Sequence, residues 1–220
     1  MSINKEKYQE IIHELNGKAT LVAVSKTKPI EDIQALYDLG HRDFGENYVQ
    51  ELVDKEAQLP KDIHWHFIGH LQSNKVKYIA PFIHLIHGID SQKLLTEINK
   101  QALKNNRVID CLLQVYIAKE ETKFGFDEHE LSELHQLHEL KNIRITGFMG
   151  MASFSDDMNL VRNEFKYLKT LFDKYSPRFT NNEQRPTLSM GMSADYKIAL
   201  EEGSNMVRIG SLLFGERNYS

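Results

Sequence analysis

Short hydrophobic runs alternate with amphipathic helical patterns along the whole chain. The runs have the character of buried strands and occupy residues 21–24, 43–44, 63–68, 84–89, 108–117, 143–149, 187–189 and 206–208. Between them, apolar residues recur at three- and four-residue spacing, which predicts helices over residues 33–37, 49–53, 76–79, 94–102, 131–140, 160–172 and 194–199. A further helix, over residues 8–15, is expected before the first strand.

This order amounts to about eight strand–helix units without a linker, and it predicts an α/β protein with a single (β/α)8 barrel of the TIM type over residues 1–220. A doubly wound open sheet is the alternative, and it is disfavoured because no GxGxxG motif follows the first strand. The polar segment 176–186 contains two prolines, so we expect a surface loop there.

Composition narrows the class of protein. The 220 residues suit one barrel domain, and the formal net charge of −4 offers no basic surface for nucleic acid. No apolar run approaches the roughly 18 residues of a membrane span, and the polar first residues do not resemble a signal peptide. The one cysteine, Cys111, lies in an apolar run and is expected in the core without a disulfide partner. We therefore expect a cytoplasmic protein, without nucleic-acid or membrane partners, and we expect a monomer.

Lys26 stands at the end of the first hydrophobic run, and Pro29 follows closely and ends the strand. An amine at the mouth of a buried strand is partly desolvated, which disfavours the ammonium form and frees the lone pair that a Schiff base requires. Taken alone, the same pattern also describes a solvated lysine that flanks a strand end.

Two loops near the end of the chain have the residues of an anion site. Residues 190–195, MGMSAD, offer Gly191 for close backbone approach and Ser193 as a helix cap and a hydroxyl group. Residues 208–211, RIGS, offer Gly210 and the hydroxyl of Ser211. These loops follow the seventh and eighth predicted strands, where TIM barrels commonly bind phosphate. Each loop alone is compatible with an ordinary turn, but a strand-one lysine facing both is a rarer coincidence.

Six motifs, in order along the chain, carry a resemblance to a known family. They are AVSKTKP at residues 23–29, FGENYVQE at 44–51, WHFIGHLQSNK at 65–75, MGMSAD at 190–195, GSNMVRIG at 203–210 and FGER at 214–217. These residues resemble the pyridoxal phosphate homeostasis proteins. The resemblance implies a barrel like the N-terminal domain of bacterial alanine racemases, and it implies binding of pyridoxal 5′-phosphate (PLP) without an established catalytic reaction.

The resemblance also implies roles for individual residues. Lys26 would form the Schiff base with PLP, Arg208 would face the pyridine nitrogen, and Asn47 would lie near the phenolate oxygen. The phosphate cup would consist of Ser193, Gly210 and Ser211, with Ser189 as a further candidate. Because a guanidinium cannot accept a proton, Arg208 would keep the pyridine unprotonated and weaken its action as an electron sink. The alternative is that Arg208 pairs with a carboxylate on the barrel rim.

Three features depart from the family pattern. No proline closely follows residues 147–149, Asn205 stands where threonine is usual, and Tyr116 stands where asparagine is usual. None of these positions is the lysine, the arginine or the phosphate cup, so the departures concern loop details.

The ten histidines raise the question of a metal site. His64 and His66 would point to the same face of a strand, and His135 and His138 lie three apart on a predicted helix. Neither pair has an evident third ligand, so structural or solvated histidines are the favoured interpretation and no metal is expected. We interpret Lys28 as a positive charge on the rim that aids the approach of an anionic cofactor.

Three functions remain open. The favoured one is a PLP carrier or buffer in intracellular PLP homeostasis that passes the cofactor transiently to apo-enzymes. The alternative is a PLP-dependent amino-acid racemase, and a weaker third is a sugar-phosphate barrel with Lys26 as an aldolase-type base. Racemisation needs two positioned bases, and in alanine racemases the resemblance assigns the second to a tyrosine of a C-terminal β domain. Only residues 209–220 follow the last predicted strand, so we expect no racemase activity and no catalytic residues.

Overall fold

Eight parallel strands close into one barrel in the computed structural model of the protein, which describes residues 3–118, 124–134, 137–179 and 185–215. The strands follow one another around the barrel in chain order. They are β1 (Thr20–Val24), β2 (Asp43–Glu46), β3 (His64–Phe67), β4 (Leu85–Ile89), β5 (Ile109–Gln114), β6 (Ile143–Met149), β7 (Thr187–Ser189) and β8 (Met206–Ile209). The predicted (β/α)8 barrel is therefore confirmed.

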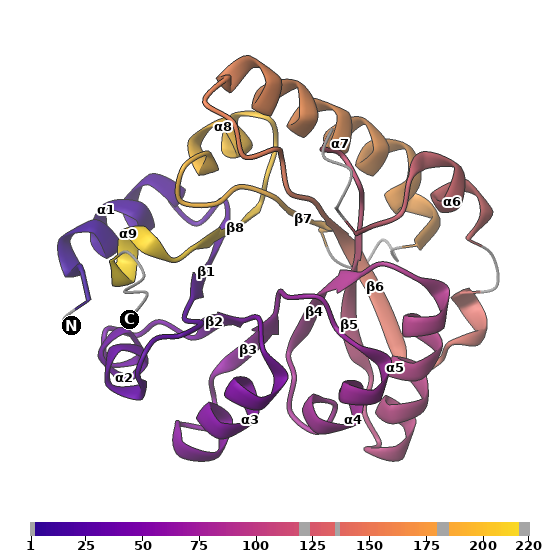
Figure 1. Cartoon of the computed structure of the whole chain (residues 1–220), viewed down its shortest axis with the longest axis horizontal. Coiled ribbons are helices and arrows are strands. Elements are labelled where there is room, and N and C mark those ends of the chain that lie inside the picture. The colour runs from indigo at the N-terminus through magenta and orange to yellow at the C-terminus, as the bar shows by residue number, and fades with distance from the viewer. Residues whose placement is uncertain (1–2, 119–123, 135–136, 180–184, 216–220) are drawn as a thin grey trace.

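Helices surround this barrel on its outside (Figure 1). They are α1 (Lys5–Leu15), α2 (Ile30–Asp38), α3 (Val49–Gln58), α4 (Val76–Ile79), α5 (Gln92–Lys104), α6 (Glu128–Glu133), α7 (Met158–Phe179), α8 (Tyr196–Glu201) and α9 (Ser211–Phe214), with short 3₁₀ turns at Ser73–Lys75 and Leu137–Glu139. Pairing of β8 with β1 closes the ring, and α1 lies beside α9 over that closure. The backbone N–H of Asn4 donates to the carbonyl of Leu213 there, at 2.8 Å.

Hydrophobic side chains fill two separate regions. The larger one lies between the strands and the helices, and α1 contributes to it with Tyr8, Ile11 and Leu15, which recur at the spacing of one helix face. The smaller one lies inside the barrel, where alternate strand residues point inward. Its buried members are Val22, Leu85, Leu112, Met149 and Met206. The inside of the barrel is thus a packed core, and the polar groups embedded in it need partners.

Three predicted elements differ from the structure. The helix expected over residues 131–140 is interrupted at Leu134, whose backbone is extended, and only a 3₁₀ turn follows it. The loop expected from residue 176 is wrong for its first four residues, because α7 continues through Pro177 to Phe179. Its apolar face continues with Tyr175 and with Phe179, which packs on the core, and this packing outweighs the hydrogen bond lost at the proline. The strand expected over residues 108–117 is shorter at both ends.

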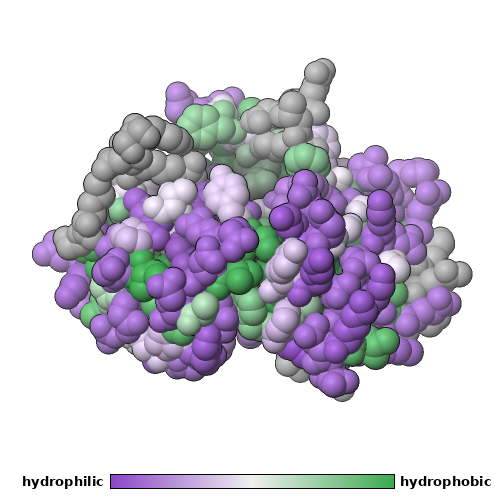
Figure 2. Space-filling view, turned by 60° about the horizontal axis from the view of Figure 1, so that its bottom comes forward, coloured by the Kyte–Doolittle hydropathy of each residue, from purple (hydrophilic) through white to green (hydrophobic). Residues whose placement is uncertain are grey.

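The surface is largely polar. Hydrophilic residues cover most of the face shown in Figure 2, and hydrophobic ones appear there as separate small patches. No helix in the described part of the chain combines the length and the apolar character needed to cross a bilayer. Cys111 is fully buried in the core as predicted, and burial raises the pKa of its thiol.

Candidate functional site

The residues predicted to hold PLP all lie at the carboxyl ends of four strands, β7, β8, β1 and β2, which are neighbours around the barrel. These residues are Lys26, Asn47, Ser189, Ser193, Arg208, Gly210 and Ser211. In TIM barrels this end carries the functional sites, because the loops that follow the strands converge there. The structure thus brings together side chains that are up to 185 positions apart in the sequence.

Lys26 occupies a tight turn two residues beyond β1 and is half-buried. The N–H of Lys28 donates to the carbonyl of Ser25 at 3.0 Å and closes the turn. Thr27 takes a φ of 62°, a conformation that is costly for a β-branched residue, and its N–H donates to Glu51 Oε1 at 2.6 Å. The turn therefore holds the backbone of Lys26 in one defined position. Lys28, interpreted above as a positive charge on the rim, donates to the carbonyls of Phe214 and Gly215, at 2.9 and 3.1 Å.

A buried ionic cluster of Lys55, Glu46 and Glu51, the Lys55 cluster, contacts this turn. The ammonium of Lys55 contacts the carbonyl of Ser25 at 2.8 Å, Glu46 Oε1 at 2.8 Å and Glu51 Oε1 at 2.6 Å. The hydroxyl of Ser25 donates to Glu46 Oε1 at 2.6 Å. Burial raises the pKa of Glu46 to about 7, although Lys55 and Ser25 oppose the shift. Sequence reasoning missed this cluster, and its only local signal is the spacing of Glu51 and Lys55, four apart on α3.

Arg208 lies inside the barrel, because it is paired in register with the inward-pointing Val22. Its Nη1 donates to the carbonyl and the hydroxyl of Ser189, at 2.9 and 2.7 Å, and its Nη2 donates to the carbonyl of Gly150 at 3.1 Å. These bonds use three of the five N–H groups of the guanidinium. Burial lowers the pKa of Arg208 to about 10, and the charge of Asp195 opposes the shift. The hydrogen bonds of Arg208 to the described residues thus go to Ser189 and Gly150, and the carboxylate of Asp195 acts on it through its charge.

The two loops predicted to bind an anion touch each other. The N–H of Gly210 donates to the hydroxyl of Ser193 at 3.3 Å, which joins the loop after β7 to the loop after β8. A Cβ atom at Gly210 would lie 3.2 Å from the carbonyl oxygen of Val24, so the backbone at Gly210 passes close to β1. Ser193 does not cap α8 as predicted, because the helix begins after Asp195, whose carboxylate accepts from the N–H of Met192 at 2.6 Å. Ser211 is the first residue of α9, a short helix that the sequence did not reveal.

Asn47 follows β2, and its Oδ1 is buried without a hydrogen-bond partner among the described residues. The second such atom is Oε2 of the neighbouring Glu46. A Cβ at Gly69 would lie 2.4 Å from the carbonyl oxygen of Asn47, so the next loop packs directly on this backbone. Buried polar atoms are nearly always hydrogen-bonded in folded proteins, and an exception indicates a missing partner.

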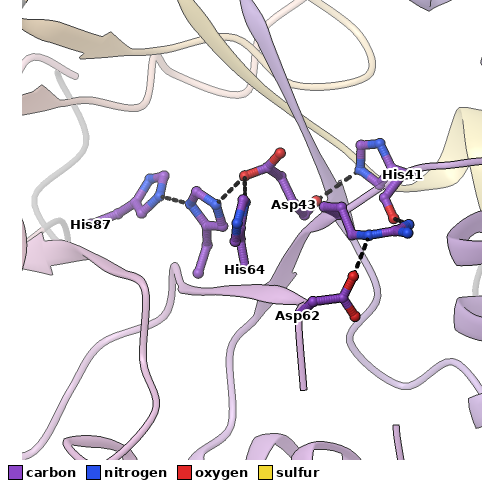
Figure 3. Close-up of polar contacts among 7 residues, drawn as sticks. His41, Asp43, Asp62, His64 and His87 are labelled. Atoms are coloured by element: carbon purple, nitrogen blue, oxygen red, sulfur yellow. Dashed lines mark hydrogen bonds and ion pairs between the residues drawn. The ribbon is translucent and has the colours of Figure 1, made fainter. Parts of the chain in front are cut away.

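A chain of hydrogen bonds crosses the inside of the barrel from Arg208 to Asp43. His87 Nδ1 lies 3.2 Å from the hydroxyl of Ser189, and His87 Nε2 lies 2.9 Å from His66 Nδ1. His66 Nε2 in turn lies 3.0 Å from Asp43 Oδ1 (Figure 3). Arginine only donates and a carboxylate only accepts, so when each ring carries a single proton every bond in the chain points from Arg208 toward Asp43. This direction makes both histidines Nε2–H tautomers.

Comparison with known proteins gives the family. The sequence family described as "Alanine racemase, N-terminal domain" matches residues 4–218. A pyridoxal phosphate homeostasis protein of Aquifex aeolicus is 45% identical over 203 residues, which are 91% of this chain and 88% of the relative. The chain belongs to the pyridoxal phosphate homeostasis proteins.

Solved structures agree with this family. PipY of Synechococcus elongatus, described as a structure with PLP bound, is 33% identical with a TM-score of 0.87, and the match covers 96% of this chain and 99% of PipY. An alanine racemase of Streptomyces coelicolor is 14% identical with a TM-score of 0.75, and the match covers 98% of this chain and 60% of the racemase. The second likeness shows a shared fold.

One departure from the family pattern has a structural explanation. Asn205 accepts from the N–H of Leu188 at 2.7 Å and donates to the carbonyl of Pro186 at 2.8 Å, so it ties the start of β8 to β7.

Of the two histidine pairs considered as metal ligands, His64 and His66 both reach Asp43, at 3.3 and 3.0 Å. His135 and the side chain of His138 fall outside the part of the chain that the structure describes.

Proposed function

We propose that this protein binds PLP at the carboxyl end of its barrel, linked to the amine of Lys26, and acts in PLP homeostasis. The observation that carries the proposal is the convergence of Lys26, Arg208 and the Ser193–Gly210 contact on adjacent strand ends. The similarity to PipY, which is described with PLP bound, over nearly the whole of both chains supports it. So do the relatives named pyridoxal phosphate homeostasis protein.

The residues at this end fit the chemistry of PLP. Arg208 retains two N–H groups beyond its three hydrogen bonds. Asn47 presents a buried amide oxygen without a partner in the described chain. Ser193, Gly210 and Ser211 offer hydroxyl and backbone groups for a phosphate. The hydroxyl of Ser189 already lies between Arg208 and His87, so we assign it to orienting Arg208 and not to the phosphate cup.

Each residue then has a defined task. Bound PLP supplies an aldehyde that condenses with an amine and a ring that can withdraw electrons. Lys26 provides the amine, from a backbone position that its turn and the Lys55 cluster fix. Arg208 cannot take a proton from the pyridine, so it leaves the ring nitrogen unprotonated and limits the withdrawal of electrons.

More specifically, we propose that the protein is a monomeric, single-domain cytoplasmic carrier. It hands PLP to apo-enzymes and catalyses no reaction of its own. The weak electron sink at Arg208 and the homeostasis role named for the relatives support this assignment. The racemase alternative rests on structural likeness at 14% identity, which concerns the fold alone. A chiral assay separates the two: we expect no D-isomer from L-alanine and other amino acids, and turnover of about 1–1000 per second would establish a racemase.

The test of the site is Lys26→Ala. We expect the purified protein to have a visible absorption band that borohydride removes, and peptide mapping to find the pyridoxyl group on Lys26. Lys26→Ala should lack the band and keep the circular dichroism of the wild type. Lys75→Ala, which removes an exposed lysine after β3, is the matched control and should keep the band. Most of the label on Lys28 or Lys75 would refute the assignment.

A further inference from the structure

The opposite, amino end of the barrel brings together three side chains of metal-ligand type. Asp43 is the first residue of β2, His66 lies on β3, and His84 directly precedes β4. One ligand atom of each lies within 4.8 Å of the others. The sequence showed only His64 and His66 and no third ligand, because Asp43 and His84 are about 20 positions away on either side and reach the cluster through strand pairing.

We propose that Asp43, His66 and His84 form a binding site for a divalent transition metal of the zinc class. Two imidazoles and one carboxylate suit such an ion, with a fourth position open to water. A tetrahedral ion with bonds of about 2.0–2.1 Å separates its ligand atoms by about 3.3 Å. His66 Nε2 and Asp43 Oδ1 are 3.0 Å apart, so they need to move by only a few tenths of an ångström. The three ligands lie at the other end of the barrel from the PLP site proposed above.

His66 also has the outer partner that metal-binding histidines commonly have. Its other nitrogen, Nδ1, lies 2.9 Å from His87 Nε2 inside the barrel (Figure 3). A metal on His66 Nε2 requires the single proton of this ring to sit on Nδ1 instead, which then donates to His87. His87 in turn becomes an Nδ1–H tautomer that donates to the hydroxyl of Ser189. Metal binding thus reverses the direction of two buried hydrogen bonds, which gives a signature distinct from loose surface binding.

The surroundings allow an ion to enter. His84 borders a cavity of about 120 Å³ that is also lined by Asp110, Arg144 and Arg185. Arg144 makes two hydrogen bonds to the carboxylate of Asp110, at 2.7 and 2.8 Å, so its charge is largely compensated. His64 stacks on His84 with ring centres 4.5 Å apart and lies 3.3 Å from Asp43. We assign His64 to positioning His84 and Asp43.

The experiment is a titration of the chelator-treated full-length protein with zinc chloride by calorimetry, and with cobalt(II) by visible absorption. We expect one ion per chain and a d–d band typical of tetrahedral cobalt. His84→Ala should weaken binding by at least about 100-fold, since even outer-shell changes cost 10–100-fold. His70→Ala is the matched control, because His70 also pairs with an aspartate, Asp90, but lies at the carboxyl end. It should bind the ion as the wild type does.

Two further measurements keep the proposal testable if His84→Ala folds poorly. Asp43→Asn preserves the size of the side chain and should also weaken binding at least about tenfold. Nitrogen NMR should show His66 and His87 changing tautomer on addition of zinc. No saturable binding, equal affinity in His70→Ala and Asp43→Asn, or unchanged tautomers would each overturn the site. None of these results depends on the absorption band of PLP on Lys26. A negative result for the metal site can therefore be told apart from a negative result for the proposed function.

Discussion

The two ends of the barrel treat buried polar groups differently. At the amino end, Asp43 pairs with His64 and His66, and Asp110 pairs with Arg144, so the ionisable groups there satisfy one another. At the carboxyl end, Glu46 and Asn47 each keep a buried oxygen without a partner in the described chain. Such unsatisfied atoms indicate a place where a ligand completes the structure. The contrast indicates the cofactor end without reference to any relative.

The chain of hydrogen bonds from Arg208 to Asp43 joins these two ends. His87 is its central link, because it contacts Ser189 on one side and His66 on the other. Burial lowers the pKa of His87 well below its usual value, so this link is neutral at pH 7. The connection therefore transmits the orientation of donors and acceptors and carries no additional charge.

The largest expected effect comes from cutting that link with His87→Leu. The substitution leaves the hydroxyl of Ser189 and Nδ1 of His66 with one partner fewer each, at a cost of about 1–3 kcal/mol per group. We expect the free energy of unfolding, measured in urea, to fall by about 2–5 kcal/mol. His70→Ala, which removes an exposed histidine from a surface pair, should change it by less than about 1 kcal/mol. A loss below 1 kcal/mol in His87→Leu would show that the two ends are not joined energetically.

The next effect concerns pH and the Lys55 cluster. The folded pKa of Glu46, about 7, lies above the unfolded value near 4.5, so the folded protein holds this proton more tightly. The contribution of Glu46 to the free energy of unfolding therefore falls as pH rises from about 4.5 to about 7. Glu46→Gln removes this dependence, and its stability relative to the wild type should rise by up to about 3 kcal/mol between pH 4 and pH 8.

Glu14→Gln is the opposite control for that experiment. Hydrogen bonds from Lys197 and Tyr196 lower the pKa of Glu14, so its stabilising contribution is present above the unfolded pKa and is lost as pH falls through the folded pKa. Glu14→Gln should therefore lower the free energy of unfolding at neutral pH and leave it unchanged in acid. Parallel pH profiles of Glu46→Gln and wild type would contradict the raised pKa of Glu46.

A smaller effect is expected from Ser193→Ala at the carboxyl end. The variant loses the hydroxyl that joins the two loops and, in the proposed function, a contact to the phosphate. We expect PLP to dissociate about fivefold more readily, which corresponds to about 1 kcal/mol for one hydrogen bond. Ser155→Ala also removes a serine that accepts from a backbone N–H in a loop after a strand, and it should bind PLP like the wild type. An unchanged dissociation constant in Ser193→Ala would remove Ser193 from the site.

The smallest effect is expected from Arg144→Ala at the amino end. The side chain of Arg144 is 45% exposed, and exposed ion pairs contribute at most about 1 kcal/mol. Thermal unfolding should therefore change by only a few degrees. PLP affinity, measured by absorption, should not change, because Arg144 precedes the carboxyl end by most of the length of β6. A clear loss of PLP affinity would mean that the two ends are less separate than the structure suggests.

Much of the fold and part of the site could be predicted from the sequence. Apolar runs located the strands and the end of the first one located Lys26, because both features are local in the chain, whereas the role of Arg208 came from the resemblance to the family. The Glu46–Lys55 pair and the His66–His87 contact could not be found this way, since each depends on the packing of separate elements. The continuation of α7 through Pro177 was missed for the same reason: a polar, proline-containing segment remains helical because Phe179 packs against the core.

Closure of the barrel between β8 and β1 has a consequence for biosynthesis. Arg208 and Gly210 follow from the last strand, and Lys26 follows from the first, so the halves of the proposed cofactor site are synthesised far apart in time. At translation rates of about 5–20 residues per second, β1 leaves the ribosome on the order of 10–40 s before β8 can join it. During that interval the nascent chain exposes an unpaired strand edge, which is a site for misassociation and for chaperone binding. Capture of the cofactor can begin only when this interval ends, so the yellow colour of a PLP protein would report completed folding of each new chain.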